Sequence, residues 1–227
     1  MRTLALALGL LCAPALAQES STPTIVTTGE ANVQRAPDVA YIGIVVETRA
    51  PTPRAAQQQN AEIMTAALKR LADAGIAREA LKTTGLRVEQ EFDYANGRRT
   101  PRGFVARTAV EARIDDVAKA GEVADLAVQG GATSLTGIRF ELKDRAAAER
   151  EALRLAVADA RARADAAAAG VGRSVGLIVK IEEARESAVT PKMYTMAVRA
   201  EAAQAQTPVE AGFLDIHARV VLTVTIQ

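Results

Sequence analysis

Apolar and polar side chains alternate in seven segments of this chain, and a period of two residues is the pattern of a β-strand with one dry and one wet face. The last segment is the clearest, because every second residue from Leu214 to Ile226 is apolar. Between these segments, apolar residues three and four positions apart indicate three amphipathic helices. The predicted strands are 25–33, 40–47, 86–94, 104–114, 136–142, 175–181 and 214–226, and the predicted helices are 53–74, 117–128 and 144–169.

The order of these elements predicts an α+β fold. Residues 39–142 run strand, helix, strand, strand, helix, strand, which is the split βαβ order of ferredoxin-like folds. We therefore expect mostly antiparallel sheets packed by three helices. Residues 24–142 would form a strand-rich part with this βαββαβ order, and residues 143–227, a long helix and two strands, would complete the fold. The sequence leaves open whether residues 143–227 form a separate domain.

The first seventeen residues have the features of a secretory signal peptide. Arg2 supplies a positive charge, an apolar run extends from Leu4 to Leu16, and Ala15-Leu16-Ala17 has the small-x-small pattern that precedes a cleavage site. The run is shorter than the roughly 20 residues that a membrane-spanning helix needs. We expect cleavage after Ala17, a periplasmic location, and no transmembrane span in the mature chain.

Removal of residues 1–17 also determines the charge and the redox chemistry of the mature chain. The only cysteine, Cys12, is lost, so no disulfide can form. Without Arg2 the 28 basic residues become 27, which equals the 27 acidic ones. A mature chain without net charge has no electrostatic attraction for nucleic acid, so we predict no nucleic-acid partner. With one histidine and no cysteine, metal sites built from nitrogen and sulfur ligands are nearly excluded.

One short stretch matches a catalytic motif. Residues 172–176, Gly-Arg-Ser-Val-Gly, have the G-x-S-x-G spacing of a serine-hydrolase elbow, which places the serine on a turn from a strand into a helix. Here Ser174 follows a helix and precedes a strand. The only histidine, His217, lies mid-strand between Asp215 and Arg219, as a surface histidine with a modest salt bridge would. We interpret the match as chance, and predict no catalytic, cofactor-binding or metal-binding residues and no enzymatic activity.

Three acidic residues alternate along the predicted strand 86–94. Their spacing of about 7 Å could suit Ca²⁺ or the paired carboxylates of a glycoside hydrolase. Arginines on the same hairpin are placed to pair with them, and we favour a solvated charge ladder. The acids are Glu89, Glu91 and Asp93. The arginines are Arg87, Arg107 and Arg113.

The third predicted helix carries a stripe of small residues that would let another backbone approach closely. Leu155 lies almost opposite Leu153 on the helical wheel, a position that could mark a second, intersubunit contact. Residues 184–211, rich in Ala, Gln and Pro, are expected to be irregular. The predicted stripe consists of Leu153, Ala156, Val157, Ala160, Ala164, Ala167 and Ala168.

Three segments, taken in order, carry a resemblance to a known family. Residues 28–40 are similar to a "G-x-G … P-D-x-A" strand pair, residues 152–172 to an alanine-rich helix that ends before a glycine, and residues 207–212 to a "T-P-I-x-P-G" entry into a last strand. Together with the export signal they resemble the bacterial SIMPL-domain family, of the exported periplasmic immunogenic protein type. The resemblance implies an α+β fold, an envelope location, self-association and a role in stress tolerance, oxidative stress in particular. It implies no catalytic residues.

Two functions of different classes follow. The first is a non-enzymatic periplasmic homo-oligomer with a structural or stress-protective role in the cell envelope. Its support is the missing catalytic set, the alanine stripe, and the regular last strand, whose edge could pair with another subunit. The alternative is a periplasmic binding module for a small apolar ligand or an envelope protein, held between sheet and helices or under residues 184–211. An enzyme that relies on Glu89 and Glu91 is a lesser third possibility, and no cofactor is expected in any of these cases.

Overall fold

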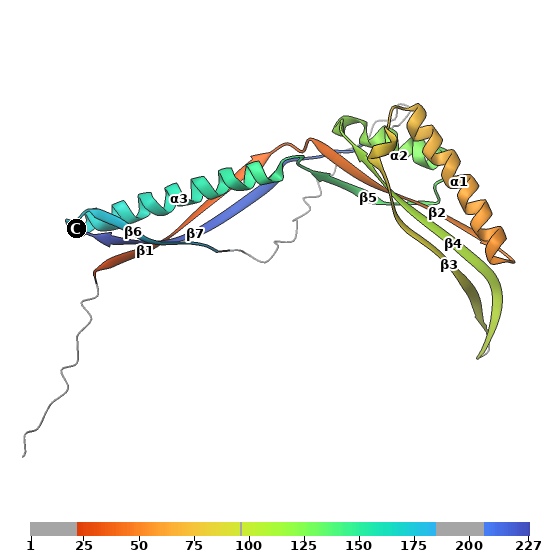
Figure 1. The fold of residues 1–227 in the computed structure, drawn as a ribbon, viewed down its shortest axis with the longest axis horizontal. Helices are drawn as coiled ribbons and strands as arrows, with labels where there is room; N and C mark the ends of the chain where they lie inside the picture. Colours follow the sequence, from red (N-terminus) through yellow and green to blue (C-terminus); the bar gives the residue numbers. More distant parts are fainter. Residues whose placement is uncertain (1–21, 96, 185–206) are drawn as a thin grey trace, which may run out of the picture.

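The computed structural model describes residues 22–95, 97–184 and 207–227. The predicted leader and most of the segment 184–211 lie outside these residues. The described part is an α+β protein with two antiparallel sheets and three α-helices, as the sequence predicts. The two sheets follow one another along the long axis of an elongated molecule, and each carries its own helices (Figure 1).

The larger sheet has four strands in the order β3-β4-β2-β5, and every neighbouring pair is antiparallel. Two helices cover one face of it, so the split βαβ order predicted for residues 39–142 is confirmed. Short 3₁₀ turns precede β3 and the second helix. The elements are β2 (Val39–Ala50), α1 (Pro53–Asp73), η1 (Arg78–Ala80), β3 (Leu81–Ala95), β4 (Arg98–Ile114), η2 (Val117–Lys119), α2 (Ala120–Gln129) and β5 (Ser134–Glu141).

The smaller sheet has three strands in the order β1-β7-β6, also antiparallel. Strand β1 therefore pairs with β7, whereas the sequence pattern predicts it as part of the strand-rich segment 24–142. Helix α3 lies along one face, over β1 and β7 (Figure 1). The elements are β1 (Thr24–Arg35), α3 (Arg145–Gly170), β6 (Val175–Glu183) and β7 (Leu214–Ile226).

Helix α1 begins and ends where its sequence predicts. Thr52 Oγ1 accepts the backbone N–H of Ala55 at 3.3 Å, Pro53 occupies the first helical position, and Gly75 follows the helix with φ of 90°. The helix is fixed to the sheet by Asn60, which is 1% exposed. Its amide donates to the backbone carbonyls of β2 and β4 at 2.9 Å each, so the polar group is buried with its hydrogen bonds satisfied.

Helix α3 packs on its sheet through alanines spaced four residues apart, from Ala148 to Ala168. The predicted stripe is right for Ala156, Ala160, Ala164 and Ala168 but wrong for Ala167, which is exposed. Only a narrow line of the helix can touch the strands when the two backbones lie this close, and a row of every fourth residue forms that line. The buried alanines are Ala148, Ala152, Ala156, Ala160, Ala164 and Ala168.

Three short links join the two sheets, and each is fixed by an aspartate: Asp38 fixes the first two and Asp125 fixes the third. Asp38 donates its backbone N–H to the carbonyl of Glu141 at 3.1 Å, and its carboxylate accepts the backbone N–H of Lys143 at 2.7 Å. On the third link, Asp125 of α2 accepts both the backbone N–H of Thr207 at 3.1 Å and its hydroxyl at 2.6 Å. The segment that resembles "T-P-I-x-P-G" therefore begins on α2 and leads into β7.

Candidate functional site

The acidic residues of β3 lie on a sheet face that carries alternating charges. Glu91 is 3.3 Å from Arg49 of β2, and Arg49 is 2.8 Å from Glu47. Arg102 of β4 reaches Asp93 at 3.5 Å. Each of these pairs is partly solvated and contributes little stability alone. The charge ladder expected from the sequence is present. However, Glu91 pairs with Arg49 and Asp93 pairs with Arg102, and neither arginine is among those expected.

The three arginines predicted to pair with the ladder have different partners from one another. Arg87 lies 3.1 Å from Glu89, as expected. Arg107 instead reaches toward Glu47 at 3.8 Å, and Arg113 lies 3.1 Å from Asp115. The partner of Arg107 follows from the sheet order, because β4 has β2 as its second neighbour and the hairpin alone does not reveal that neighbour. Arg113 lies beyond the last paired residue of β3 and contacts the aspartate two positions further along the chain. Among the described residues, no group of three or more His, Cys, Asp or Glu side chains is arranged to hold a metal ion.

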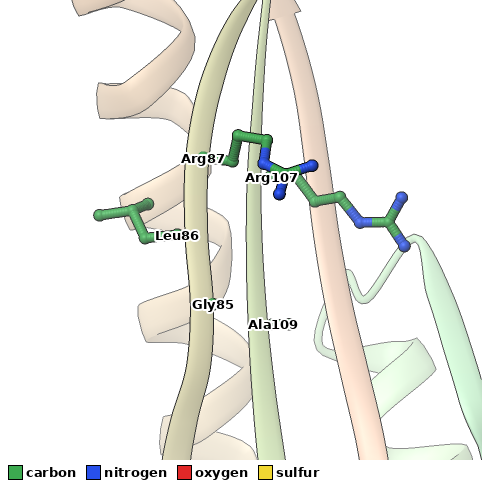
Figure 2. A pocket seen from close by; sticks show the side chains of 5 residues that line it. All are labelled: Gly85, Leu86, Arg87, Arg107 and Ala109. Carbon is green, nitrogen blue, oxygen red and sulfur yellow. The ribbon is translucent and has the colours of Figure 1, made fainter.

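A shallow hollow of about 280 Å³ interrupts this face. It forms where Gly85 of β3 lies opposite Ala109 of β4, because two small residues leave the sheet surface uncovered. The next pair along the strands is Arg87 opposite Arg107. Figure 2 shows both arginine side chains on one side of the sheet, while Leu86 points to the other side. Two guanidinium groups therefore lie at the rim of the hollow, each close to a carboxylate, Arg87 to Glu89 and Arg107 to Glu47.

Ser174 and His217 lie on exposed strand or strand-end positions and do not form a hydrolase site. Ser174 exchanges backbone hydrogen bonds with Gln227 at the end of the sheet, in the turn that leads from α3 into β6. Beside His217, Asp215 accepts the side-chain amides of Asn32 and Gln34 at 3.0 Å each. These amide donors hold the pKa of the Asp215 carboxyl below its usual value. The aspartate is thus engaged with β1 and does not orient an imidazole.

The last strand, β7, cannot pair with another subunit in the way expected from its sequence. It lies between β1 and β6, so both of its edges already carry a neighbouring strand. The expectation was wrong because the regularity of a strand does not indicate whether it is central or at an edge. The alanine stripe of α3 is likewise used within the chain, against β1 and β7.

The two real edges of the three-stranded sheet differ strongly. On β1, the outward backbone N–H of Glu30 donates to the carboxylate of Asp159 on α3 at 3.0 Å. This hydrogen bond, together with Arg163, lowers the pKa of Asp159. Helix α3 packs closely on β1 but hardly touches β6. The β1 edge is therefore shielded by the helix, and the β6 edge is open in the part of the chain that the structure describes.

Strand β6 also exposes aliphatic side chains along most of its length. A soluble edge strand is ordinarily protected by charge, proline or a covering element. Here the side chains of Leu177, Ile178, Val179 and Ile181 are 75%, 51%, 59% and 50% exposed. We call this strand the β6 edge. The available sequence signal was the run Leu177-Ile178-Val179, which breaks the two-residue alternation.

Comparison with known proteins gives this arrangement a family. The family model for SIMPL, described as a protein of unknown function (DUF541), matches residues 25–225. The 26 kDa periplasmic immunogenic protein of Brucella melitensis is 29% identical over 184 residues, which cover 77% of this chain and 74% of that protein. The uncharacterized protein YggE of Escherichia coli K12 is 26% identical over 159 residues, 70% of this chain and 65% of YggE. Within the described residues, no helix has the length and apolar character needed to cross a membrane. Because the match extends from β1 to β7, the chain belongs to the SIMPL family.

Proposed function

We propose that the protein is a non-enzymatic, periplasmic homo-oligomer with a structural or stress-protective role in the cell envelope. The β6 edge carries this proposal, because an open strand with four exposed aliphatic side chains is a surface that water solvates poorly. A second strand added there would satisfy its outward backbone groups and cover the aliphatic row. The export signal predicted in residues 1–17 and the periplasmic name of the Brucella relative support the location.

The side chains that were candidates for catalysis support the non-enzymatic part of the proposal. Glu91 is paired with Arg49, Glu89 with Arg87, and Asp215 with two amides. A general acid or base needs a pKa near the working pH, whereas Asp215 is held in its charged form by its hydrogen bonds. Replacing Glu89 and Glu91 with glutamine should therefore change no catalytic property of the protein.

The mass of the exported protein in solution tests the assembly. We expect size-exclusion chromatography with light scattering to give a defined multiple of the protomer mass at micromolar concentration. A single monomeric peak would contradict the proposal. The protective role is tested separately by deleting the gene and exposing cells to hydrogen peroxide. Survival should fall and return with the full chain, and unchanged survival would remove the stress-protective role.

A second candidate function is ligand binding in the hollow between Gly85 and Ala109. Arg87 and Arg107, which lie opposite each other, favour a ligand with a carboxylate or phosphate group that would replace Glu89 and Glu47 as their partners, over the purely apolar ligand considered from the sequence. Mass spectrometry of the denatured protein should then release a stoichiometric acidic small molecule. Its loss from the Arg87→Gln/Arg107→Gln variant, with the fold retained by circular dichroism, would support binding, and a clean spectrum from the unchanged protein would oppose it.

A further inference from the structure

The hydrogen bonds of β6 reveal which of its backbone groups face outward. Ala184 donates its N–H to the carbonyl of Arg219 at 3.0 Å, and the register continues with Glu182 opposite Val221 and Lys180 opposite Thr223. In an antiparallel pair, hydrogen-bonded and non-hydrogen-bonded residues alternate along each strand. Ile181 and Glu183 therefore direct their N–H and C=O groups away from β7, toward the open edge.

We propose that this edge pairs with β6 of a second copy of the chain, antiparallel, about a two-fold axis at Ile181. The inference rests on the proposed homo-oligomer and specifies its interface. A two-fold axis requires that residues pair with themselves or in reciprocal sets, so only a few registers are possible. The centre of the pairing decides which side chains meet.

The charges of β6 select among these registers. Lys180 and Glu182 lie on the face of the sheet away from α3. Within the strand they form an ion pair, with Lys180 Nζ 2.9 Å from Glu182 Oε1. A centre at Lys180 would place two lysines opposite each other, and a centre at Glu182 or Glu183 would place two glutamates opposite each other. Like charges in direct opposition are destabilising. A centre at Ile181 instead places each Lys180 opposite Glu182 of the second copy, which gives two reciprocal ion pairs.

The backbone geometry agrees with the same centre. Both the N–H and the C=O of Ile181 point toward the open edge, so the two copies of this residue would exchange a pair of backbone hydrogen bonds. Lys180 and Glu182 then fall in non-hydrogen-bonded pairs, in which side chains approach most closely. A centre at Val179 would leave these charges without a cross-strand partner. It would also fall on the register irregularity between Ile178 and Lys180.

The pairing has a defined architectural result. Both three-stranded sheets would merge into one six-stranded sheet in the order β1-β7-β6-β6-β7-β1, closed at each end by the edge that Asp159 already shields. Because opposed residues of an antiparallel pair project to the same face, both copies of α3 would lie on one side. The two copies of the half-exposed Ile181 would lie opposite each other on that same side.

Cysteine cross-linking tests the register in the exported protein. The full chain is expressed with Cys12→Ser, so that an introduced thiol is the only one. With Ile181→Cys, the Cα atoms of the two copies would be about 5.5 Å apart, within reach of a disulfide, and oxidation should give a covalent dimer. The matched control is Val179→Cys, whose two copies would be displaced by about 13 Å and should not cross-link.

The outcomes separate the interface from the assembly itself. An oligomer by light scattering that cross-links through Val179, or through neither site, would overturn the Ile181-centred interface and leave the proposed function intact. A monomer by light scattering would overturn both. An Ile181 cross-link in a native oligomer would establish the interface.

Charge exchange gives a second test that does not depend on thiols. Lys180→Glu places two glutamates opposite each other at both ends of the proposed pairing, and we expect the dissociation constant to rise about tenfold. The double variant Lys180→Glu/Glu182→Lys restores opposite charges, both within the strand and between copies, and should return the original mass profile. Equal masses for the single variant and the unchanged protein would contradict the charge-selected register, provided circular dichroism shows both folded.

Discussion

Gly29 is the residue on which the close packing of α3 depends. It lies in the middle of β1, and a Cβ atom there would come within 2.0 Å of the carbonyl oxygen of Ala156 and 2.3 Å of the backbone nitrogen of Ala160. Beside it, the hydroxyl of Thr27 donates to the carbonyl of Ala160 at 2.8 Å. The strand and the helix therefore touch through their backbones, which only glycine on one side and alanine on the other permit.

Replacing Gly29 with alanine should lower the free energy of unfolding by about 2–3 kcal/mol, because the added methyl group meets backbone that cannot move aside. Chemical denaturation monitored by circular dichroism measures the change. The control is Gly170→Ala at the end of α3, where nothing lies within 4 Å of the added atom. That variant should stay within about 0.5 kcal/mol of the unchanged protein. Equal losses from both variants would contradict the close-contact explanation.

The contact between Asp125 and Thr207 should make stability depend on pH. The hydroxyl and then the backbone N–H of Thr207 lower the pKa of Asp125 from its ordinary value of 3.8. A lowered folded-state pKa stabilises the folded protein above 3.8, and this contribution is lost as the pH falls through the folded value. The urea midpoint of Thr207→Val should thus lie below that of the unchanged protein at neutral pH and approach it in acid.

A threonine that donates to a carbonyl instead of a carboxylate provides the comparison for this prediction. Thr65 donates its hydroxyl to the carbonyl of Ala61 at 2.7 Å on the exposed side of α1. The difference between Thr65→Val and the unchanged protein should not vary across the same pH range. A gap for Thr207→Val that is equally constant would show that Asp125 does not titrate through this contact.

At the scale of elements, α3 shows how far a periodic pattern can be interpreted. The sequence places Ala160 and Ala167 on one apolar face, whereas the structure buries the first and exposes the second. Ala160 packs with Leu222 and Val224 of β7 and lies directly over Gly29. The face that contacts a sheet is narrower than the face that merely avoids charge.

Leucine substitutions at Ala160 and Ala167 test whether the contact face of α3 is the narrow row seen in the structure or the wider stripe predicted from the sequence. Ala160→Leu should cost about 1–3 kcal/mol of unfolding free energy, because the larger side chain would have to separate α3 from β1. Ala167→Leu should change it by less than about 0.5 kcal/mol. Thermal and urea unfolding of both variants provide the measurement. A comparable loss of unfolding free energy in Ala167→Leu would show that the wider predicted stripe does contact the sheet.

Local sequence patterns made the helices and strands predictable. They did not reveal which strands lie next to each other or which side chains pair between them. Thr52, Pro53 and Gly75 set the limits of α1 within the chain itself, and alternation marked β2 and β7 in the same way. The pairing of Arg49 with Glu91 was missed because it depends on β2 lying beside β4, which no neighbouring residue encodes. The open edge of β6 was missed for the same reason: a strand becomes an edge only when the other strands are placed.

At the scale of the whole molecule, we propose that the two sheets are separate folding units. The core of the larger sheet is formed by β2, β4, α1 and α2, with Val209 packed against it from the third link. The core of the smaller sheet is formed by β1, α3 and β7. The proposed boundary therefore lies at Asp38 and near Lys143, and the smaller unit is assembled from both ends of the chain.

A fragment of residues 37–144 should fold by itself under this division. It contains all four strands and both helices of the larger sheet, and it loses the contacts of Thr207 and Val209 and the packing of Leu142 on the smaller sheet. We expect a mixed α/β circular dichroism spectrum and a cooperative urea transition at a lower midpoint than in the full chain. A fragment with the spectrum of an unfolded chain would show that the two sheets fold as one unit.

The pairing of β1 with β7 has a consequence for the order of events during synthesis. The two strands match along their whole lengths, from Thr24 opposite Thr225 to Arg35 opposite Leu214. In chain order β1 precedes every strand of the larger sheet and β7 follows them all, so α3 is synthesised before the sheet on which it packs can be complete. The three-stranded sheet can therefore close only once β7 has been made, and a chain cut short before β7 would carry a helix with a bare alanine face.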